Sequence, residues 1–201
     1  MKVKGHLLAT GAVTLALGLV GTSANAAGVF TLQSKTFEDG HIMPKKVANN
    51  NPKNPNCVGQ NVSPEFHWSN VPDGTKSFVL LMSDPEARGG ALLSHWVAYG
   101  IPATATGLAE GEATNDSKSY VGGKSFFGVG HYMGPCTPPN VSPHHYTFIL
   151  VATDFAPIDQ PPGLTRAEIQ EKLAPAGQPP AHFKGDTGMV GLFVNPWRPN
   201  E

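Results

Sequence analysis

The pattern of hydrophobic and polar positions predicts several short β-strands. Apolar runs of six or seven residues are bounded by polar or turn-forming residues, and residues 65–68 form a shorter candidate strand before a turn. They are too short for typical helices and suit buried strands, and several are rich in the β-branched and aromatic residues that strands favour. The expected strands are residues 65–68, 77–82, 95–101, 146–152 and 189–194.

The connections between these runs favour an antiparallel β-sandwich. The chain has 23 glycines and 19 prolines, residues that are unfavourable inside helices and common in turns. Residues 49–56 form a polar, asparagine-rich connection that we expect to be an exposed loop. Short strands joined by such connections are typical of sandwiches, whereas regularly alternating strands and helices would indicate a parallel sheet.

One segment near the C-terminus predicts a short helix. Thr165 and Glu168 have the spacing of a capping box, in which each side chain accepts a hydrogen bond from the other residue's backbone amide. Leu164 and Ile169 occupy the positions of a hydrophobic staple, and Pro175 ends the helix. The sequence therefore predicts a mostly β protein with one or two short peripheral helices.

The first 26 residues have the order of a secretory signal peptide. Lys2 and Lys4 precede an apolar run at residues 7–20, and Ala24-Asn25-Ala26 provides a cleavage site. The run is shorter than the roughly 18–20 residues that cross a membrane. We expect residues 1–26 to be removed, so that residues 27–201 form one periplasmic or secreted domain without a membrane span.

Composition excludes a nucleic-acid partner. Removal of the two leader lysines from the 14 basic residues leaves 12 against 15 acidic residues, a net charge near −3. Such a chain offers no basic surface for a phosphate backbone. Hydrophobic residues make up 40% of the sequence, which is enough for a core and argues against disorder.

Two cysteines, Cys57 and Cys136, lie in the part of the chain expected to be exported. An oxidising compartment favours a disulfide over free thiols or metal ligation. Two cysteines by themselves do not complete a structural zinc site, which needs four ligands. We therefore expect a Cys57–Cys136 disulfide.

Two segments place ionisable residues at the edges of apolar runs. The first is residues 83–88, followed by His95. The second is residues 128–139, which are rich in glycine, proline and aromatic residues and precede His144. Because polar groups at strand ends form pocket walls where neighbouring loops converge, these segments are candidates for a binding site.

The same segments resemble the two signatures of the phosphatidylethanolamine-binding family, in its bacterial Raf-kinase-inhibitor-like branch. Asp84-Pro85-Glu86-Ala87 with His95-Trp96-Val97 is similar to the first signature, an Asp-Pro-Asp-Ala-Pro box and its following histidine strand. Residues 130–139 with His144-His145-Tyr146 are similar to the second, a Gly-Pro-x-Pro-Pro loop and its histidine strand. The matches run in order from about residue 28 to residue 195 and so cover the whole mature chain.

The resemblance implies a β-sandwich with a shallow pocket at one end that holds a small anion or a phosphoryl headgroup, without a cofactor or metal. Imidazole and backbone N–H groups can donate hydrogen bonds to the oxygens of an anion. Asp84 is expected to orient His95 or to raise its pKa. The implied ligand-binding residues are Asp84, His95, His144 and Tyr146, with the backbone near Gly134 and Pro135.

Strand geometry supports one of these assignments independently. His144 and Tyr146 are two residues apart and share a face of a strand, whereas His145 faces the other side. The chain also departs from the family pattern, because Arg88 stands where the first signature normally ends in proline. Arg88 either adds a cation to the pocket or is a solvated loop charge.

Three other functions remain open from the sequence. A hydrolase could use Asp84, His95 and His144, although the chain has no Gly-x-Ser-x-Gly motif, and we expect no catalysis. The histidines could bind a metal, although a His-Glu-x-x-His motif is lacking. The chain could also modulate a protein partner, which the sequence does not identify.

Overall fold

The computed structural model describes residues 1–2, 28–139 and 141–195. Almost all of the expected leader, residues 3–26, lies outside these ranges. Within the described ranges, the helices are all too short or too polar to cross a membrane.

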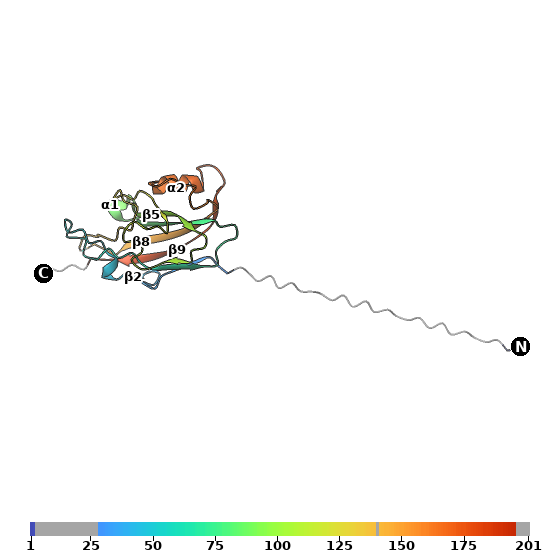
Figure 1. Cartoon of the computed structure of the whole chain (residues 1–201). Coiled ribbons are helices and arrows are strands. Elements are labelled where there is room, and N and C mark those ends of the chain that lie inside the picture. The colour runs from blue at the N-terminus through green and yellow to red at the C-terminus, as the bar shows by residue number, and fades with distance from the viewer. Residues whose placement is uncertain (3–27, 140, 196–201) are drawn as a thin grey trace.

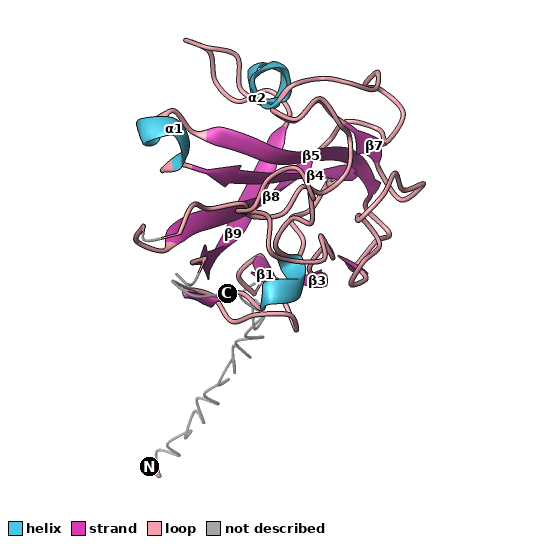
Figure 2. Cartoon of the chain, turned by 90° about the vertical axis from the view of Figure 1, so that its left-hand side faces the viewer, coloured by secondary structure: helices cyan, strands magenta, loops and turns pink. Residues whose placement is uncertain are grey.

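A six-stranded sheet forms the main layer of the molecule (Figures 1 and 2). Its strands pair antiparallel, apart from the short edge strand β2, which runs parallel to β9. In spatial order the strands are β2 (His41–Ile42), β9 (Phe183–Phe193), β8 (His144–Thr153), β4 (Ser77–Asp84), β5 (Leu93–Pro102) and β7 (Val121–Gly122).

A smaller sheet packs against one face of the large one. It contains β1 (Thr31–Gln33), β3 (Phe66–Ser69) and β6 (Gly107–Leu108), all paired antiparallel. Aromatic rings join the two layers: Phe66 lies 5.0 Å from Phe148, and Trp68 lies 5.2 Å from Phe78, between ring centroids. The main hydrophobic core therefore fills the space between the sheets, as in a β-sandwich.

The outer face of the large sheet is covered by helix α2 (Arg166–Leu173), which Figure 1 shows above β5. Ile169 and Leu173 of the helix pack on Val79, Leu81 and Val97 in a second, smaller core. The predicted capping box at Thr165 and Glu168 is confirmed. The other helices of the described ranges are the 3-10 turn η1 (Lys45–Val47) and the single turn α1 (Ala87–Gly90).

The five predicted strands are confirmed as β3, β4, β5, β8 and β9, although β9 begins at Phe183, six residues earlier than expected. The sequence did not indicate β1, β2, β6 and β7, which have only two or three residues each and depend on pairing with longer neighbours. The loop at residues 49–56 was expected to be exposed, but its first residue, Asn49, is buried. The Asn49 amide donates to the Pro135 carbonyl at 2.8 Å, which ties the start of the loop to the second signature segment.

Candidate functional site

A cavity of about 410 Å³ lies at the end of the large sheet where β4 finishes and β5 and β8 begin. Its walls combine the ends of these strands with segments from three loops. The lining residues are Asn54, Asp84, Glu86, Ala87, Arg88, Leu93, His95, Phe127, Cys136, Thr137, Pro138, Val141, His144 and Tyr146. The structure therefore brings together four of the predicted residues: Asp84, His95, His144 and Tyr146.

Asp84 fixes the ring of His144. The Asp84 carboxyl is buried, and its Oδ2 lies 2.7 Å from Nδ1 of His144. Its Oδ1 accepts hydrogen bonds from the amides of Glu86 and Ala87, each at 3.0 Å. Because a carboxylate accepts, Nδ1 of His144 carries the proton of this contact, and Nε2 is the ring nitrogen left for a ligand.

His95 is held by a different acceptor from the one expected. Its Nδ1 lies 2.7 Å from the Met133 carbonyl oxygen, whereas the Asp84 carboxylate bonds to His144. Burial lowers the pKa of His95 below its ordinary value, against the smaller opposing effects of the Met133 carbonyl and the Asp84 charge. Asp84 therefore does not orient His95, which corrects one part of the expectation. Its charge does raise the pKa of His95 as expected, but burial outweighs this effect.

A β-bulge aims His95 into the cavity. Met82 pairs with Trp96 but Ser83 pairs with Ser94, so β5 has one extra residue, His95, at this point. Simple alternation from Trp96, which faces the main core, would turn His95 toward α2. The extra residue resets the alternation, as bulges beside functional sites commonly do.

The prediction from strand alternation in β8 is confirmed. Tyr146 is buried, and its ring lies 5.2 Å from that of His95 in an edge-to-face contact. Burial raises the pKa of Tyr146 well above its ordinary value, so its hydroxyl stays protonated. His145 points away from the core and its Nδ1 lies 2.7 Å from Oε1 of Glu86.

Gly134 and Pro135 are not among the lining residues of the cavity. The Gly134 amide donates to Oδ1 of Asn61 at 2.8 Å, and so it is already paired. A Cβ at position 134 would collide with the Val47 carbonyl oxygen, so the glycine allows two backbone segments to approach closely. Gly134 and Pro135 therefore hold the loop that forms this wall in place without contacting the cavity.

Sequence reasoning missed other residues of the wall. Thr137 is only 2% exposed, and its hydroxyl has no hydrogen-bond partner among the described residues. Phe127 and Val141 are exposed apolar residues at the cavity. The signal for Thr137 was available as a polar residue within the second signature.

The sequence left open whether Arg88 joins the pocket. Arg88 lines the cavity and places its guanidinium 5.3 Å from the centre of the Phe126 ring.

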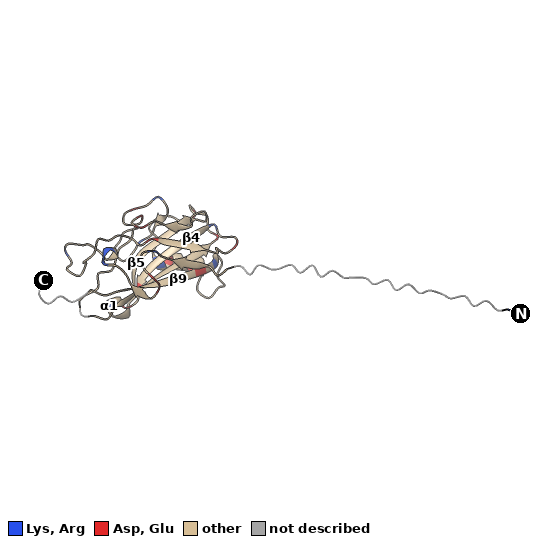
Figure 3. Ribbon diagram, turned by 90° about the horizontal axis from the view of Figure 1, so that it is seen from below, with Lys and Arg blue, Asp and Glu red and all other residues tan. Residues whose placement is uncertain are grey.

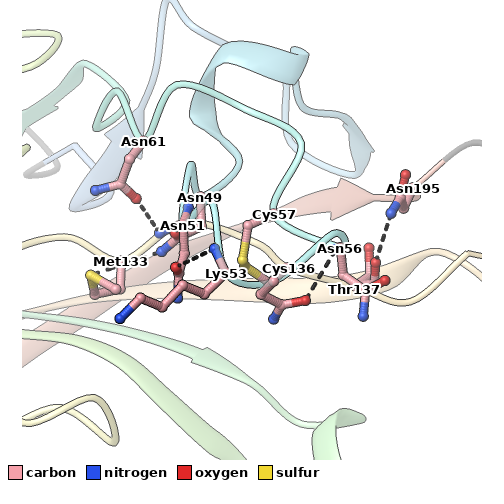
Figure 4. The surroundings of a disulfide bond; sticks show 12 residues. Asn49, Asn51, Lys53, Asn56, Cys57, Asn61, Met133, Cys136, Thr137 and Asn195 are labelled. Atoms are coloured by element: carbon pink, nitrogen blue, oxygen red, sulfur yellow. Dashed lines mark hydrogen bonds between the residues drawn. A yellow bond between two sulfur atoms is a disulfide. The ribbon is translucent and has the colours of Figure 1, made fainter.

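The predicted Cys57–Cys136 disulfide is present and joins two walls of the cavity (Figure 4). Cys136 lines the cavity directly, and the loop that carries Cys57 contributes Asn54. A hydrogen bond provides a second link, because the side-chain amide of Asn195 donates to the Thr137 carbonyl at 3.1 Å. The loop containing the second signature is therefore held from both sides.

Three side chains of the cavity have the chemistry of metal ligands. Asp84, Glu86 and His144 offer one ligand atom each, and these atoms lie within 4.8 Å of one another. The Asp84 oxygens, however, accept hydrogen bonds from His144 and two amides, and Glu86 contacts His145. A cation bound by all three would have to replace part of this network.

The fold and the cavity define a class of protein, a β-sandwich with a small pocket at the end of its larger sheet that contains ionisable side chains. The family model for phosphatidylethanolamine-binding protein matches residues 33–184. The chain belongs to this family.

Similar proteins extend this result. A UPF0098 protein of Aquifex aeolicus is 36% identical over 141 residues, 70% of this chain and 77% of that protein. UPF0098 protein YbcL of Escherichia coli is 39% identical over 109 residues, 51% of this chain and 60% of that protein. The crystal structure of E. coli YbcL, described as a new member of the mammalian PEBP family, matches with a TM-score of 0.71 and 28% identity, and covers 83% of this chain and 98% of that one.

Proposed function

We propose that the mature chain is an exported binding protein whose cavity holds a small anion or a phosphoryl headgroup. One observation carries the proposal: both cavity histidines have Nδ1 engaged by an acceptor, which leaves Nε2 of each ring for a ligand. The leader-like first 26 residues and the disulfide support export. Figure 3 shows Lys and Arg at scattered positions along the ribbon, which fits a small ligand better than a nucleic acid.

The chemistry of the rings determines how such a site responds to pH. A neutral ring whose Nδ1 carries the proton offers only a lone pair at Nε2, whereas a protonated ring donates from Nε2. An anion therefore gains a charge-assisted hydrogen bond when a ring is protonated. The Thr137 hydroxyl supplies a further donor that does not depend on pH, and a ligand oxygen would satisfy it.

The same geometry favours binding over hydrolysis. A serine or cysteine nucleophile needs a hydrogen bond to its base. In the described part of the chain, the hydrogen bonds of His95 and His144 go to a carbonyl and a carboxylate, and neither ring contacts a hydroxyl or a thiol. We therefore propose that the site binds its ligand without turning it over.

Titration of phosphate by calorimetry from about pH 5.5 to 8.5 tests the proposal, because the range surrounds the reference histidine pKa of about 6.5. We expect binding to weaken as the pH rises, and His144→Ala to weaken it by about tenfold at the acid end, the equivalent of one charge-assisted hydrogen bond. Thr137→Val, which replaces the hydroxyl with a methyl group of similar size, should weaken binding equally at every pH.

His182→Ala is the matched control for this titration. His182 also contacts a carboxylate through Nδ1, at 2.7 Å from Asp154, but it does not line the cavity. This variant should bind phosphate as wild type does. Equal binding by wild type and His144→Ala at every pH would show that the cavity is not the anion site.

A further inference from the structure

A second concave surface lies on the α2 side of the large sheet, which we call the Ser94 groove. It has a volume of about 460 Å³ and lies between the start of β5, the loop after β7 and the first turn of α2. It shares no lining residue with the cavity described above. The residues that matter for its chemistry are Leu92, Ser94, Lys124, Phe126 and Arg166.

The bulge that turns His95 into the cavity also turns Ser94 into this groove. Ser94 pairs with Ser83 across β4 and β5, so the two side chains share the face that α2 covers. The Ser83 hydroxyl lies 2.6 Å from Nη1 of Arg166, which places the guanidinium over this pair of serines. The two sites are therefore back to back, separated by one strand.

The cations that line the groove form no close ion pair among the described residues. The ion pairs of lysine or arginine in the described ranges are Lys46–Glu110 and Lys184–Asp154, so neither Arg166 nor Lys124 has one there. Glu168, the acid in the first turn of α2, is engaged in the capping box with Thr165. The hydrogen bonds from Thr165 lower the pKa of Glu168, and the nearby charge of Lys124 adds a smaller effect in the same direction. Because a partly buried charge is normally paired, the Arg166 guanidinium is available to an anion.

Ser94 supplies a second and independent sign of a ligand. Its hydroxyl oxygen is buried and has no hydrogen-bond partner among the described residues. Buried polar groups are nearly always hydrogen-bonded, and an oxygen of a bound anion would satisfy this donor. Rotation of the Ser94 side chain about its Cα–Cβ bond would present this hydroxyl to a ligand that also contacts the Arg166 guanidinium and the Lys124 ammonium.

The rim of the groove is apolar. Leu92 is 43% exposed and Phe126 is 55% exposed, and both line the groove. Exposed apolar side chains beside a cluster of polar groups are typical of sites for small organic ligands. The rim favours a ligand with a flat apolar body over a bare inorganic ion.

We propose that the Ser94 groove is a second ligand site, which binds an organic oxyanion: a carboxylate or a phosphate monoester attached to an apolar group. Arg166 and Lys124 hold the charge, the Ser94 hydroxyl donates to an oxygen, and Leu92 and Phe126 contact the apolar body. The two sites have no wall residue in common, so the inference does not depend on the function proposed for the cavity. They touch at one point, where the guanidinium of Arg88 in the cavity lies 5.3 Å from the centre of the Phe126 ring.

Amide NMR of the ¹⁵N-labelled mature protein tests the proposal with phenyl phosphate, benzoate and inorganic phosphate as probes. Phenyl phosphate and benzoate should shift the amide signals of Ser94, Ser125 and Ala167, and both should bind there more tightly than inorganic phosphate. His144→Ala should leave these shifts unchanged, so failure of the cavity and failure of the groove are distinguishable.

Variants of the cations complete the test. Arg166→Gln should weaken phenyl phosphate binding at the groove by about tenfold or more, as expected for a lost charge-assisted contact. Lys124→Gln should also weaken phenyl phosphate binding. Because Lys124 is exposed, this variant should fold normally even if Arg166→Gln does not. Lys172→Gln is the matched control, because Lys172 lies in the last turn of α2 and outside the groove.

Three outcomes would overturn the proposal. In the first, the aromatic probes shift only amides around the cavity. In the second, both Arg166→Gln and Lys124→Gln bind phenyl phosphate as the Lys172→Gln control does. In the third, inorganic phosphate binds the groove as tightly as phenyl phosphate, which would remove the role of the apolar rim.

Discussion

At the scale of single residues, two histidines of one cavity differ because their Nδ1 atoms meet different acceptors. His144 contacts the buried carboxylate of Asp84 and keeps part of its ring accessible. His95 contacts a neutral carbonyl and is buried, and burial is the main reason for its lowered pKa. The same side-chain type therefore has two electrostatic environments within one site.

The lowered pKa of His95 predicts an acid-sensitive stability in the absence of ligand. As the pH falls below 6.5, the unfolded chain takes up the His95 proton while the folded protein does not. The stability contribution of the neutral ring is complete above pH 6.5 and is lost as the pH falls toward the folded pKa. The free energy of unfolding should drop by up to about 1.4 kcal/mol per pH unit in this range.

Urea unfolding of wild type and His95→Gln between pH 7.5 and 5 measures this effect. Glutamine can still donate to the Met133 carbonyl but does not titrate, so the variant should show a flatter pH dependence. Asp84, His144 and Tyr146 face His95 and are retained in both proteins. Identical slopes in the two proteins would contradict the assignment of a neutral, buried ring.

At the scale of elements, the capping box makes a prediction about α2. The Thr165 hydroxyl accepts from the Glu168 amide at 3.3 Å, and the Glu168 carboxylate accepts from the Thr165 amide at 2.8 Å. Thr165→Ala should reduce the free energy of unfolding by about 1 kcal/mol, because it leaves an amide of the first turn without its acceptor. Thr165→Ser keeps the hydroxyl and should be close to wild type in urea unfolding. Equal stability of all three proteins would argue against a helix start at this residue.

At the scale of the whole molecule, the disulfide links segments 79 residues apart in the sequence and fastens two walls of the cavity. In the chain-entropy account, a loop of this length restricts the unfolded state by roughly 4 kcal/mol. The double variant Cys57→Ala, Cys136→Ala should lose stability of about this size in urea unfolding, and a dithiol reductant should have the same effect on wild type. An unchanged unfolding midpoint after complete reduction would contradict this role.

The sequence alone determined the long strands, the start of α2, the disulfide and the pairing of His144 with Tyr146 on one face. These features depend on local patterns: runs of apolar residues, a cap at fixed spacing and the two-residue period of a strand. The two cysteines allowed only one intramolecular pairing. Local chemistry is sufficient wherever the physical cause lies within a few residues.

Only the tertiary structure decided which groups meet in the cavity. Three features depend on the register between segments far apart in the sequence. They are the bulge at His95, the hydrogen bond between Asp84 and His144, and the hydrogen bond from the Gly134 amide to Asn61. Thr137 became a candidate because folding buries its hydroxyl without a partner. Register and burial are settled by packing of the whole chain, and a shift of one residue in a strand turns a side chain to the opposite face.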